Sequence, residues 1–394
     1  MATPRIAFII QRYGLEVVGG AEALCRTMAR HLLPYWQIEV LTTCAHDHMT
    51  WANAFPAGTS EIEAVTVRRF PVDRPRHVAT FNRCNERILL RFHSFGEEER
   101  WMDLQGPHSA ALQAHLAEHG GDYDGFVLFN YLYATTYDSL ARVGRRFYLV
   151  PFAHDEPPVY LRLFEKVFRS PRGIVFCTDE ERDFIRGRFA FPLPSAEVIG
   201  MGVDLPAEAD AERFRAKFDI RQPFMLYAGR IDESKGCDEL FRDYLNYRAG
   251  LGPSGRPLLL VLCGSSQLTI PPREDIRYLG FVSEQDKSDA MAAARFLVLP
   301  SRFESLSIVL LEAWAAGAPV LVNGHCDVSV GQCRRSGGGV WYRNGDEFRA
   351  AADWLARDDE LRERLGRQGR EFVRRYYHWP RIIERYREFI RFDS

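Results

Sequence analysis

The sequence predicts an α/β protein with two Rossmann-like, doubly wound domains that face a central cleft. The length of 394 residues suits two domains of 150 to 200 residues better than one. Short apolar runs alternate with helical stretches along the whole chain, as in parallel sheets covered by helices. Residues 295–323 show the complete pattern of one strand–helix–strand unit.

That unit begins with the apolar run 296–299, which Pro300 ends as expected for a buried strand. Residues 306–316 are nearly all apolar, are too many for an ordinary strand and are rich in helix formers. Gly317 can adopt the left-handed conformation that ends a helix. Residues 319–323 then form the next predicted strand.

Two carboxylates occur in this unit, Glu304 before the helix and Glu312 within it. Burying an unpaired carboxylate is costly, so Glu312 should have a polar partner. Eight helical residues rise about 12 Å, which roughly spans a sugar ring, a pyrophosphate and a ribose. The loop after a strand lies where open α/β sheets bind ligands, and a helix amino terminus there favours anions. A solvated Glu304 and a locally paired Glu312 remain the structural alternative.

The spacing of Glu304 and Glu312 resembles the E-x7-E signature of retaining glycosyltransferases with the GT-B fold, family 4 in particular (glycosyl transferases group 1). The resemblance implies that Glu304 faces the donor sugar and that Glu312 binds the ribose hydroxyls. The backbone amides of Ser305, Leu306 and Ser307 would meet the diphosphate. Many members have Gly-Phe-Gly at these three positions, so this chain departs from the pattern.

Residues 5–10 form the first predicted strand, and Gly19 and Gly20 open the helix that follows it. A strand, glycine loop and helix bring backbone amides to phosphate, although the dinucleotide fingerprint G-x-G-x-x-G is absent. Gly-Gly-Ala-Glu here resembles the first loop of family 4, which implies close passage of the donor at both glycines. A helix start that needs glycine for its turn is the alternative.

The second half begins with the predicted strand 224–228, followed by Gly229, Arg230 and, five residues later, Lys235. Gly229 lets the backbone approach a ligand, and the two cations suit charge-assisted bonds to phosphate. The chain has only four lysines, so a lysine is rarely found at a motif position by chance. The segment resembles the family's Gly-Arg-x-x-x-x-Lys-Gly, which implies that Arg230 and Lys235 hold the diphosphate.

Two further residues are assigned roles through the resemblance. His154 follows the predicted strand 147–152, and many members have a cleft histidine there, beside the donor sugar or the acceptor. A loop histidine bonded to a neighbouring carboxylate is the alternative. Val282 follows the predicted strand 276–281, where the family contacts the nucleobase through backbone groups.

The predicted domains are 1–202 for the acceptor and 223–377 for the nucleotide sugar. Residues 203–222 are polar and are interpreted as the linker. The last helix, 378–394, resembles the closing segment of GT-B chains, which crosses back onto the first domain. Residues 347–375 are expected to form amphipathic helix, and 71–105 a helical pair.

Composition excludes several classes. The net charge of −2 argues against nucleic-acid binding, and no apolar run reaches the 18 residues of a membrane span. No signal peptide is expected, and scattered cysteines without C-x-x-C indicate a reducing, cytoplasmic location. No metal site and no cofactor besides the co-substrate are predicted. An acceptor-binding or membrane-surface role for residues 71–105 is left open, although the acids there disfavour anionic lipid.

The resemblance to family 4 therefore implies a retaining, metal-independent hexosyltransferase that uses a nucleoside-diphosphate sugar and a saccharide or lipid-linked acceptor. Polysaccharide, lipopolysaccharide or glycoconjugate synthesis would be its context. The alternatives are a nucleotide-sugar epimerase on the same fold and a non-catalytic sugar-nucleotide-binding scaffold.

Overall fold

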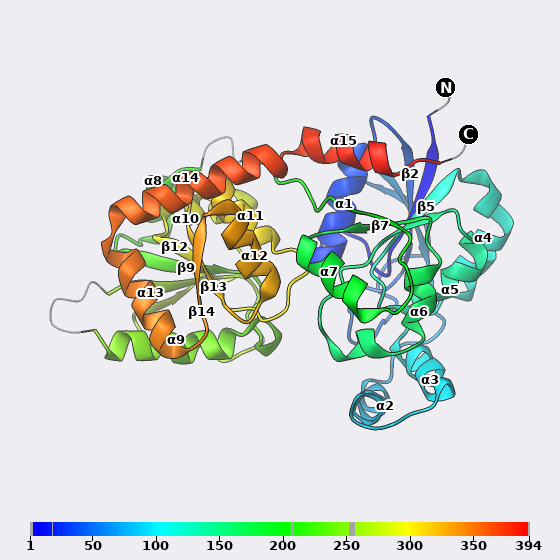
Figure 1. Cartoon of the computed structure of the whole chain (residues 1–394), viewed down its shortest axis with the longest axis horizontal. Coiled ribbons are helices and arrows are strands. Elements are labelled where there is room, and N and C mark those ends of the chain that lie inside the picture. Colours follow the sequence, from blue (N-terminus) through cyan, green and yellow to red (C-terminus); the bar gives the residue numbers. More distant parts are fainter. Residues whose placement is uncertain (1–2, 18, 206–208, 252–256, 393–394) are drawn as a thin grey trace. The chain divides into compact units, whose positions relative to one another are not determined.

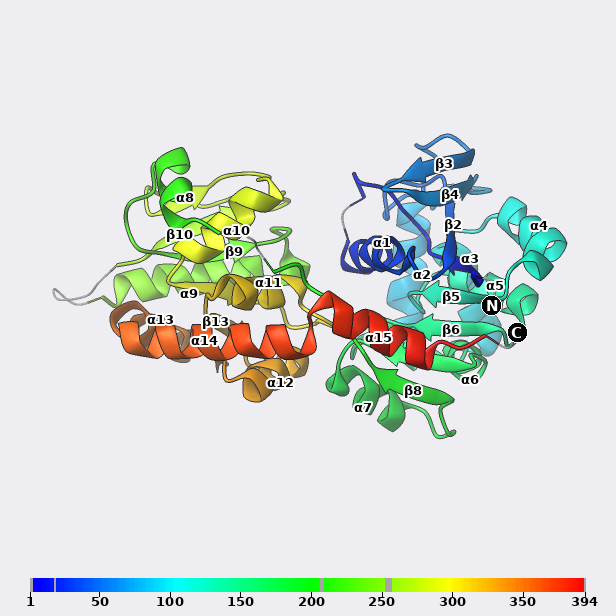
Figure 2. The ribbon, with the colours of Figure 1, turned by 90° about the horizontal axis from the view of Figure 1, so that it is seen from above.

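The computed structural model describes residues 3–17, 19–205, 209–251 and 257–392, which divide into two α/β units. Unit 1 comprises Met1–Met201 and Ile383–Ser394, and unit 2 comprises Gly202–Ile382. Each unit has one sheet with helices on both faces (Figures 1 and 2). The predicted fold class, with two Rossmann-like units, is confirmed.

Unit 1 contains an eight-stranded sheet of order β3-β4-β2-β1-β5-β6-β7-β8. All its neighbouring strands run parallel except the edge pair β3 and β4. The central strand β1 pairs Phe8 with Val40 on one side and with Val127 on the other. The strands are β1 Arg5–Ile9, β2 Gln37–Thr43, β3 Gly58–Ile62, β4 Val65–Phe70, β5 Gly125–Phe129, β6 Phe147–Val150, β7 Gly173–Phe176 and β8 Ser195–Val198.

The helices of unit 1 cover this sheet, and the apolar strand residues are buried between them. A pair of helices, α2 and α3, stands at one end of the unit (Figure 1), as predicted for residues 71–105. The helices are α1 Gly20–Leu32, α2 Val78–Leu90, α3 Phe95–Gln105, α4 Ala110–His119, α5 Ala134–Val143, α6 Phe164–Arg169 and α7 Asp179–Arg188, with short 3-10 turns at Gly120–Asp122 and Pro157–Tyr160.

Unit 2 contains a six-stranded, all-parallel sheet of order β11-β10-β9-β12-β13-β14. Its strands are β9 Phe224–Ala228, β10 Leu259–Cys263, β11 Ile276–Tyr278, β12 Phe296–Leu299, β13 Val320–Asn323 and β14 Gly339–Tyr342. Its helices are α8 Ala211–Phe218, α9 Cys237–Ala249, α10 Glu284–Ala293, α11 Ile308–Ala316, α12 Asp327–Ser336, α13 Gly345–Arg357 and α14 Asp359–Tyr376, with a 3-10 turn at Glu233–Lys235. The last helix, α15, spans Trp379–Phe389.

The segment 203–222, interpreted as a linker, is structured as part of unit 2 in its described residues. Its helix α8 is held to α10 by Arg213, whose Nε donates to the buried Asp289 carboxylate at 2.6 Å. Residues 206–208 of that prediction lie outside the described residues. Polar composition alone does not reveal such an ion pair.

The C-terminal residues 383–392 contact unit 1 through α15 and the residues after it. Tyr386 donates its hydroxyl to Gly200 O at 2.8 Å, and Phe389 and Phe392 pack on Tyr148. The amphipathic helix predicted for residues 347–375 is present as two helices, because Asp358 takes an extended conformation and caps α14. None of the helices described by the structure is long and apolar enough to cross a membrane.

Candidate active site

The carboxyl ends of β9 and β10 approach each other at two glycines of unit 2. Gly229, at φ +151°, donates its N–H to Cys263 O at 2.9 Å. A Cβ atom on Gly264 would lie 1.9 Å from Gly229 O. No side chain fits at Gly264, so the backbone of the Gly229 loop is exposed at this edge of the sheet without a covering residue there.

The loop after Gly229 is shaped by Asp232. Its Oδ1 accepts the backbone N–H of Lys235 at 2.9 Å, which starts the short 3-10 turn. Gly236 follows at φ +72°, where a Cβ would lie 2.7 Å from Pro300 O at the end of β12. Because only glycine allows this approach, the loop bearing Arg230 and Lys235 lies directly against the loop bearing Glu304.

Lys235 and Glu304, 69 residues apart in sequence, form an ion pair in this arrangement. Lys235 Nζ donates to Glu304 Oε1 at 2.8 Å. The Glu304 side chain is 10% exposed and that of Lys235 is 30% exposed, so the pair is partly withdrawn from water. The spacing predicted both residues at this edge of the sheet, and the structure brings their charged groups together.

Arg230 also lies on this loop, with its guanidinium 3.5 Å from the Asp232 carboxylate. Its side chain is one-third exposed, and its carbonyl accepts a hydrogen bond from the Tyr227 hydroxyl. The backbone of Arg230 is therefore fixed while its guanidinium remains reachable from solvent.

Glu312 has a polar partner, as the cost of burying a carboxylate requires. Lys287 Nζ, on α10, donates to Glu312 Oε1 at 3.0 Å and lies 2.8 Å from Glu284 Oε2. Burial raises the pKa of Glu312, and the neighbouring Lys287 opposes that shift. Burial lowers the pKa of Lys287, but the two carboxylates outweigh it and leave that pKa raised. Lys287 therefore holds the Glu312 carboxylate in place.

The helical segment of the E-x7-E motif is shorter than predicted. α11 begins at Ile308, so Glu304 and Ser305 lie in the loop and the 12 Å helical rise between the two acids is wrong. Ser307 precedes the first helical residue, and its side chain makes no capping hydrogen bond. The first-turn amides of α11, beside Leu306 and Ser307, therefore have no hydroxyl cap from their own N-cap residue.

Val282 lies between β11 and α10 and is half-buried, directly before the N-cap Ser283 of α10. β11 ends at Tyr278, three residues earlier than the predicted strand. The structure gives Val282 no contact that indicates a role, so its assignment rests on the resemblance.

In unit 1, Gly19 and Gly20 differ in what surrounds them. A Cβ on Gly19 would lie 2.1 Å from Glu22 Oε2, whereas a Cβ on Gly20 would meet nothing within 4 Å. Glu22 is buried, and its Oε1 accepts from Arg12 Nε and Gln11 Nε2, each at 3.0 Å. Gly19 is thus required by the packing of Glu22, while Gly20 leaves open space at the helix start.

His154 lies in the loop after β6, where its Nε2 is 3.4 Å from Glu156 Oε2. This contact is the one predicted by the alternative interpretation, in which His154 is a loop histidine bonded to a neighbouring carboxylate. Below the loop, the buried Glu181 accepts the backbone N–H of Ala153 at 2.6 Å and of Cys177 at 2.7 Å. Burial raises the pKa of Glu181 to about 8, against those hydrogen bonds. Glu181 fixes the backbone of the residue that precedes His154.

Sequence reasoning missed Lys287, Glu22 and Glu181 as parts of these arrangements. The scarcity of lysine could have indicated Lys287, because three of the four lysines are paired with acids of unit 2. Glu22 stands in the Gly-Gly-Ala-Glu segment, but its partner Arg12 is not part of the pattern. Nothing in the sequence distinguishes Glu181 from the two acids before it, which begin the same helix.

Comparison with known proteins connects this geometry to a family. Residues 208–372 match the family model described as Glycosyl transferases group 1. An alpha-D-kanosaminyltransferase of Streptomyces kanamyceticus is 29% identical over 214 residues, covering 50% of this chain and 54% of that protein. The chain thus aligns with about half the length of that relative. An uncharacterized glycosyltransferase of Methanocaldococcus jannaschii is 29% identical over 404 aligned positions, covering 96% of each.

Solved structures resemble the whole chain. Anabaena HepE, solved in complex with UDP-glucose, has a TM-score of 0.69 and 15% identity, and the match covers 98% of each chain. Solved structures at this level of similarity include GT-B glycosyltransferases, so the GT-B prediction is confirmed. The resemblance to glycosyl transferases group 1 is confirmed as well.

Proposed function

Since residues 208–372 match the family model described as Glycosyl transferases group 1, we propose that the chain transfers a hexosyl unit from a nucleoside-diphosphate sugar to a hydroxyl acceptor. The transfer retains the anomeric configuration. UDP-glucose, the ligand of the Anabaena HepE structure, is the first donor to test. Synthesis of a polysaccharide, lipopolysaccharide or glycoconjugate is the proposed context.

The observation that carries this proposal is the Lys235–Glu304 pair at the carboxyl end of the unit 2 sheet. A lysine and a carboxylate 2.8 Å apart can bind two parts of one donor. The ammonium can bind the diphosphate, and the carboxylate can accept hydrogen bonds from the sugar hydroxyls. Arg230, one-third exposed on the same loop, adds a second cation. Held by glycines and an aspartate cap, the groups are organised before the donor arrives.

In the proposed step, the acceptor hydroxyl oxygen bonds to the anomeric carbon on the face that the diphosphate leaves. The bond between that carbon and the β-phosphate oxygen breaks, and both its electrons stay with the nucleoside diphosphate. The hydroxyl proton passes to a phosphate oxygen of the leaving group. Arg230, Lys235 and the first-turn amides of α11 stabilise the charge that develops there, while Glu304 orients the sugar.

Glu312 is assigned to the ribose of the donor. Lys287 occupies its Oε1, and Oε2 is assigned to accept from ribose hydroxyls. In this account Lys287 is a positioning residue, and its charge opposes the rise that burial causes in the pKa of Glu312. The amides of Ser305, Leu306 and Ser307 are assigned to the diphosphate, and the loops at Gly229 and Val282 to the phosphate and the base.

Unit 1 is assigned to the acceptor, with Gly19 and Gly20 near the donor phosphates and His154 beside the reacting sugar. The open space at Gly20 is consistent with a ligand passing close to the backbone. The buried Glu181 supports the His154 loop from below through two main-chain hydrogen bonds.

Peripheral association with a membrane is also proposed, through the turn between α2 and α3. Leu90 and Phe92 there are almost entirely exposed. The nearby acids are partly neutralised, since Glu97 pairs with Arg87 and the buried Glu98 pairs with Arg162 and His93. Exposed apolar residues that follow one another in a turn can insert at a lipid interface. Loss of vesicle flotation in Phe92→Ser would support this surface, and unchanged flotation would remove it.

No metal ion or other cofactor is assigned to the reaction, because the protein supplies the positive charge. Turnover with UDP-glucose and a panel of glycoside acceptors should be unchanged by chelation of divalent cations. Magnesium-dependent turnover would contradict the assignment of that charge to Arg230 and Lys235.

The experiment is product analysis by proton NMR of wild-type reactions with UDP-glucose, GDP-mannose and ADP-glucose, with and without acceptors. An α-linked product from an α-linked donor supports retention. An epimerised nucleotide sugar without acceptor would indicate the epimerase, and tight nucleotide binding without any product would indicate the scaffold.

A further inference from the structure

Two ion pairs join the same two segments of unit 2. The first is the Lys235–Glu304 pair of the candidate active site, and the second joins Arg302 to Glu239 in the first turn of α9. Arg302 donates from Nη2 to Glu239 Oε1 at 2.8 Å and from Nε to Oε2 at 3.4 Å. In each segment the cation precedes the acid, and the cation of one segment pairs with the acid of the other.

This crossed arrangement specifies one register between the two segments. A shift along them would bring Arg302 toward Lys235 or Glu239 toward Glu304, and like charges repel each other. The fork of Arg302 adds direction, since a planar guanidinium binds both oxygens of a carboxylate in one orientation. The Arg302 side chain is 50% exposed and that of Glu239 is 27% exposed, so solvent screens the pair. Its contribution is therefore to orientation more than to stability.

The loop that carries Glu304 is also fixed at its start. Asn323, which is 2% exposed, donates from its side-chain amide to Pro300 O at 2.9 Å. A Cβ on Gly236 would lie 2.7 Å from the same oxygen, so the turn before α9 packs on this loop. The contact of Arg302 with α9 lies between this anchor and Glu304, and it directs the loop toward the Lys235 side of unit 2.

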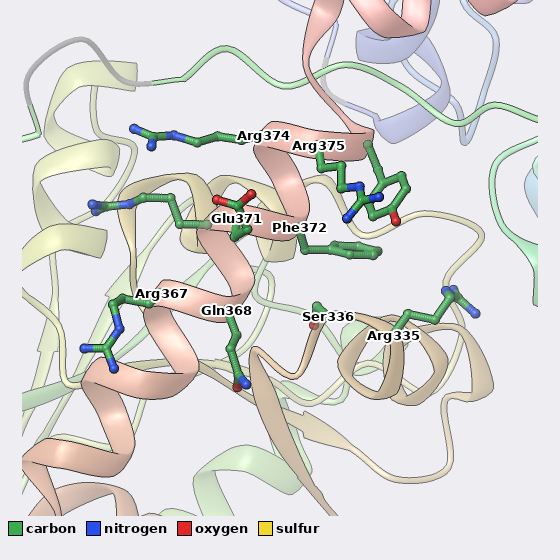
Figure 3. Close-up of a pocket in the computed structure, with 10 residues that line it drawn as sticks. Arg335, Ser336, Arg367, Gln368, Glu371, Phe372, Arg374 and Arg375 are labelled. Atoms are coloured by element: carbon green, nitrogen blue, oxygen red, sulfur yellow. The ribbon is translucent and has the colours of Figure 1, made fainter.

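Arg302 differs in this respect from the arginines that line a hollow of about 660 Å³ beside α14. Figure 3 shows the side chains of Arg367 and Arg374 on the opposite side of α14 from those of Arg335 and Arg375. Their charges do not meet at one place, whereas the carboxylate of α9 orients Arg302. The hollow therefore indicates no anion site, and the oriented cation lies beside the proposed donor site.

In the proposed function the Lys235 ammonium binds the diphosphate, which weakens its hold on Glu304. We propose that the Arg302–Glu239 pair keeps Glu304 oriented toward the donor sugar while the ammonium is engaged there, an inference that rests on the proposed function. Arg302 and Glu239 are thus positioning residues. Residues 305–307 continue into α11 and are fixed from that side, so loss of the pair should affect the sugar contact more than the diphosphate contact.

The test compares each nucleotide sugar with its nucleoside diphosphate, so that it reports on the sugar contact itself. UDP and UDP-glucose, GDP and GDP-mannose, and ADP and ADP-glucose are titrated by calorimetry into the full chain. The site variants are Arg302→Gln, Glu239→Gln and the two combined. Arg295→Gln is the matched control, because Arg295 lies just before the other end of β12 and pairs with Asp359 at 2.8 Å.

We expect each site variant to raise the dissociation constant of the bound nucleotide sugar about fivefold and that of the nucleoside diphosphate less than about twofold. The combined variant should bind no more weakly than Arg302→Gln, since either change alone breaks the same contact. Arg295→Gln should change both constants less than about twofold.

Three results would overturn the proposal and leave the proposed function standing. These are an equal rise for the nucleotide and the nucleotide sugar, no rise in Arg302→Gln, and a combined effect equal to the product of the single effects. The first would indicate a direct phosphate contact or a general loss of structure, and the last would show that the two residues act independently. Absence of binding of any of these compounds to the unmodified chain would instead overturn the proposed function, and this inference with it.

Discussion

The two units hold the carboxylates near their proposed ligand loops in different ways. In unit 2, Glu304 and Glu312 are each paired with a lysine from another loop or helix. In unit 1, Glu22 is bound by an arginine of its own loop region, and Glu181 by backbone N–H groups. The lysine pairs are partly exposed and can exchange partners with a ligand, whereas the unit 1 carboxylates are buried and serve the fold. The comparison indicates that unit 2 carries the charges of the chemistry and unit 1 provides rigid backbone.

The largest expected effect is on turnover from Lys235→Ala. Removing the ammonium takes away charge stabilisation at the leaving diphosphate, and one such group is commonly worth about 10²- to 10³-fold in rate. We expect kcat to fall by about that factor while the melting temperature changes little. Lys217→Ala is the matched control, since Lys217 pairs with Asp286 at an exposed position. Near-normal turnover in Lys235→Ala would contradict the claim that unit 2 supplies the charges used in the reaction.

The next effect is on stability and distinguishes the two glycines of unit 1. Gly19→Ala should lower the free energy of unfolding by roughly 2 kcal/mol, because its Cβ displaces Glu22 from a buried ion pair. Gly20→Ala should leave stability unchanged or slightly higher and lower kcat/KM, since the new methyl group enters only open space. Chemical denaturation and donor kinetics measure both. Equal loss of stability in the two variants would contradict the described packing.

A smaller effect is expected on nucleotide affinity from Lys287→Ala. Without Lys287, burial dominates and the pKa of Glu312 rises further, so a larger fraction of its carboxyl is neutral. The dissociation constant for the matching nucleoside diphosphate should rise about tenfold at neutral pH and recover in part as pH increases. Glu284→Ala is the control, because Glu284 is exposed and its charge raises the pKa of Glu312, so its removal should not weaken nucleotide binding. A loss that does not depend on pH would leave Lys287 without the proposed electrostatic role.

The last effect concerns the pH dependence of stability through Glu181. Its folded-state pKa of about 8 lies above that of an unfolded glutamate, so the folded state retains a proton that the unfolded state releases between pH 4.5 and about 8. The stabilisation is fully present below pH 4.5 and is lost as pH rises through about 8, at roughly 1 kcal/mol per pH unit or less. Glu181→Gln should flatten this slope in denaturation experiments from pH 5 to 8. An unchanged slope would show that Glu181 is ionised throughout.

Much of unit 2 could be predicted from sequence because its motifs are contiguous. The strands 224–228 and 296–299 were predicted with the bounds that the structure gives, since each is a continuous apolar run with a clear stop. Contacts between distant segments could not be predicted. Lys287 contacts Glu312 only because α10 packs beside α11. The spacing of apolar residues along the sequence does not show which helices pack together. Similarly, the antiparallel edge strand β3 is polar and exposed, so no apolar run indicated it.

The division between the units is tested most directly by calorimetric titration of the purified protein with UDP, GDP and ADP, alongside Arg230→Ala. The account predicts selective micromolar binding of one nucleotide, lost in Arg230→Ala while the variant keeps its melting temperature. That result would place the donor charges in unit 2 and name the series of sugar nucleotides to use. Binding of none of the three, or equal binding by Arg230→Ala, would contradict the central claim.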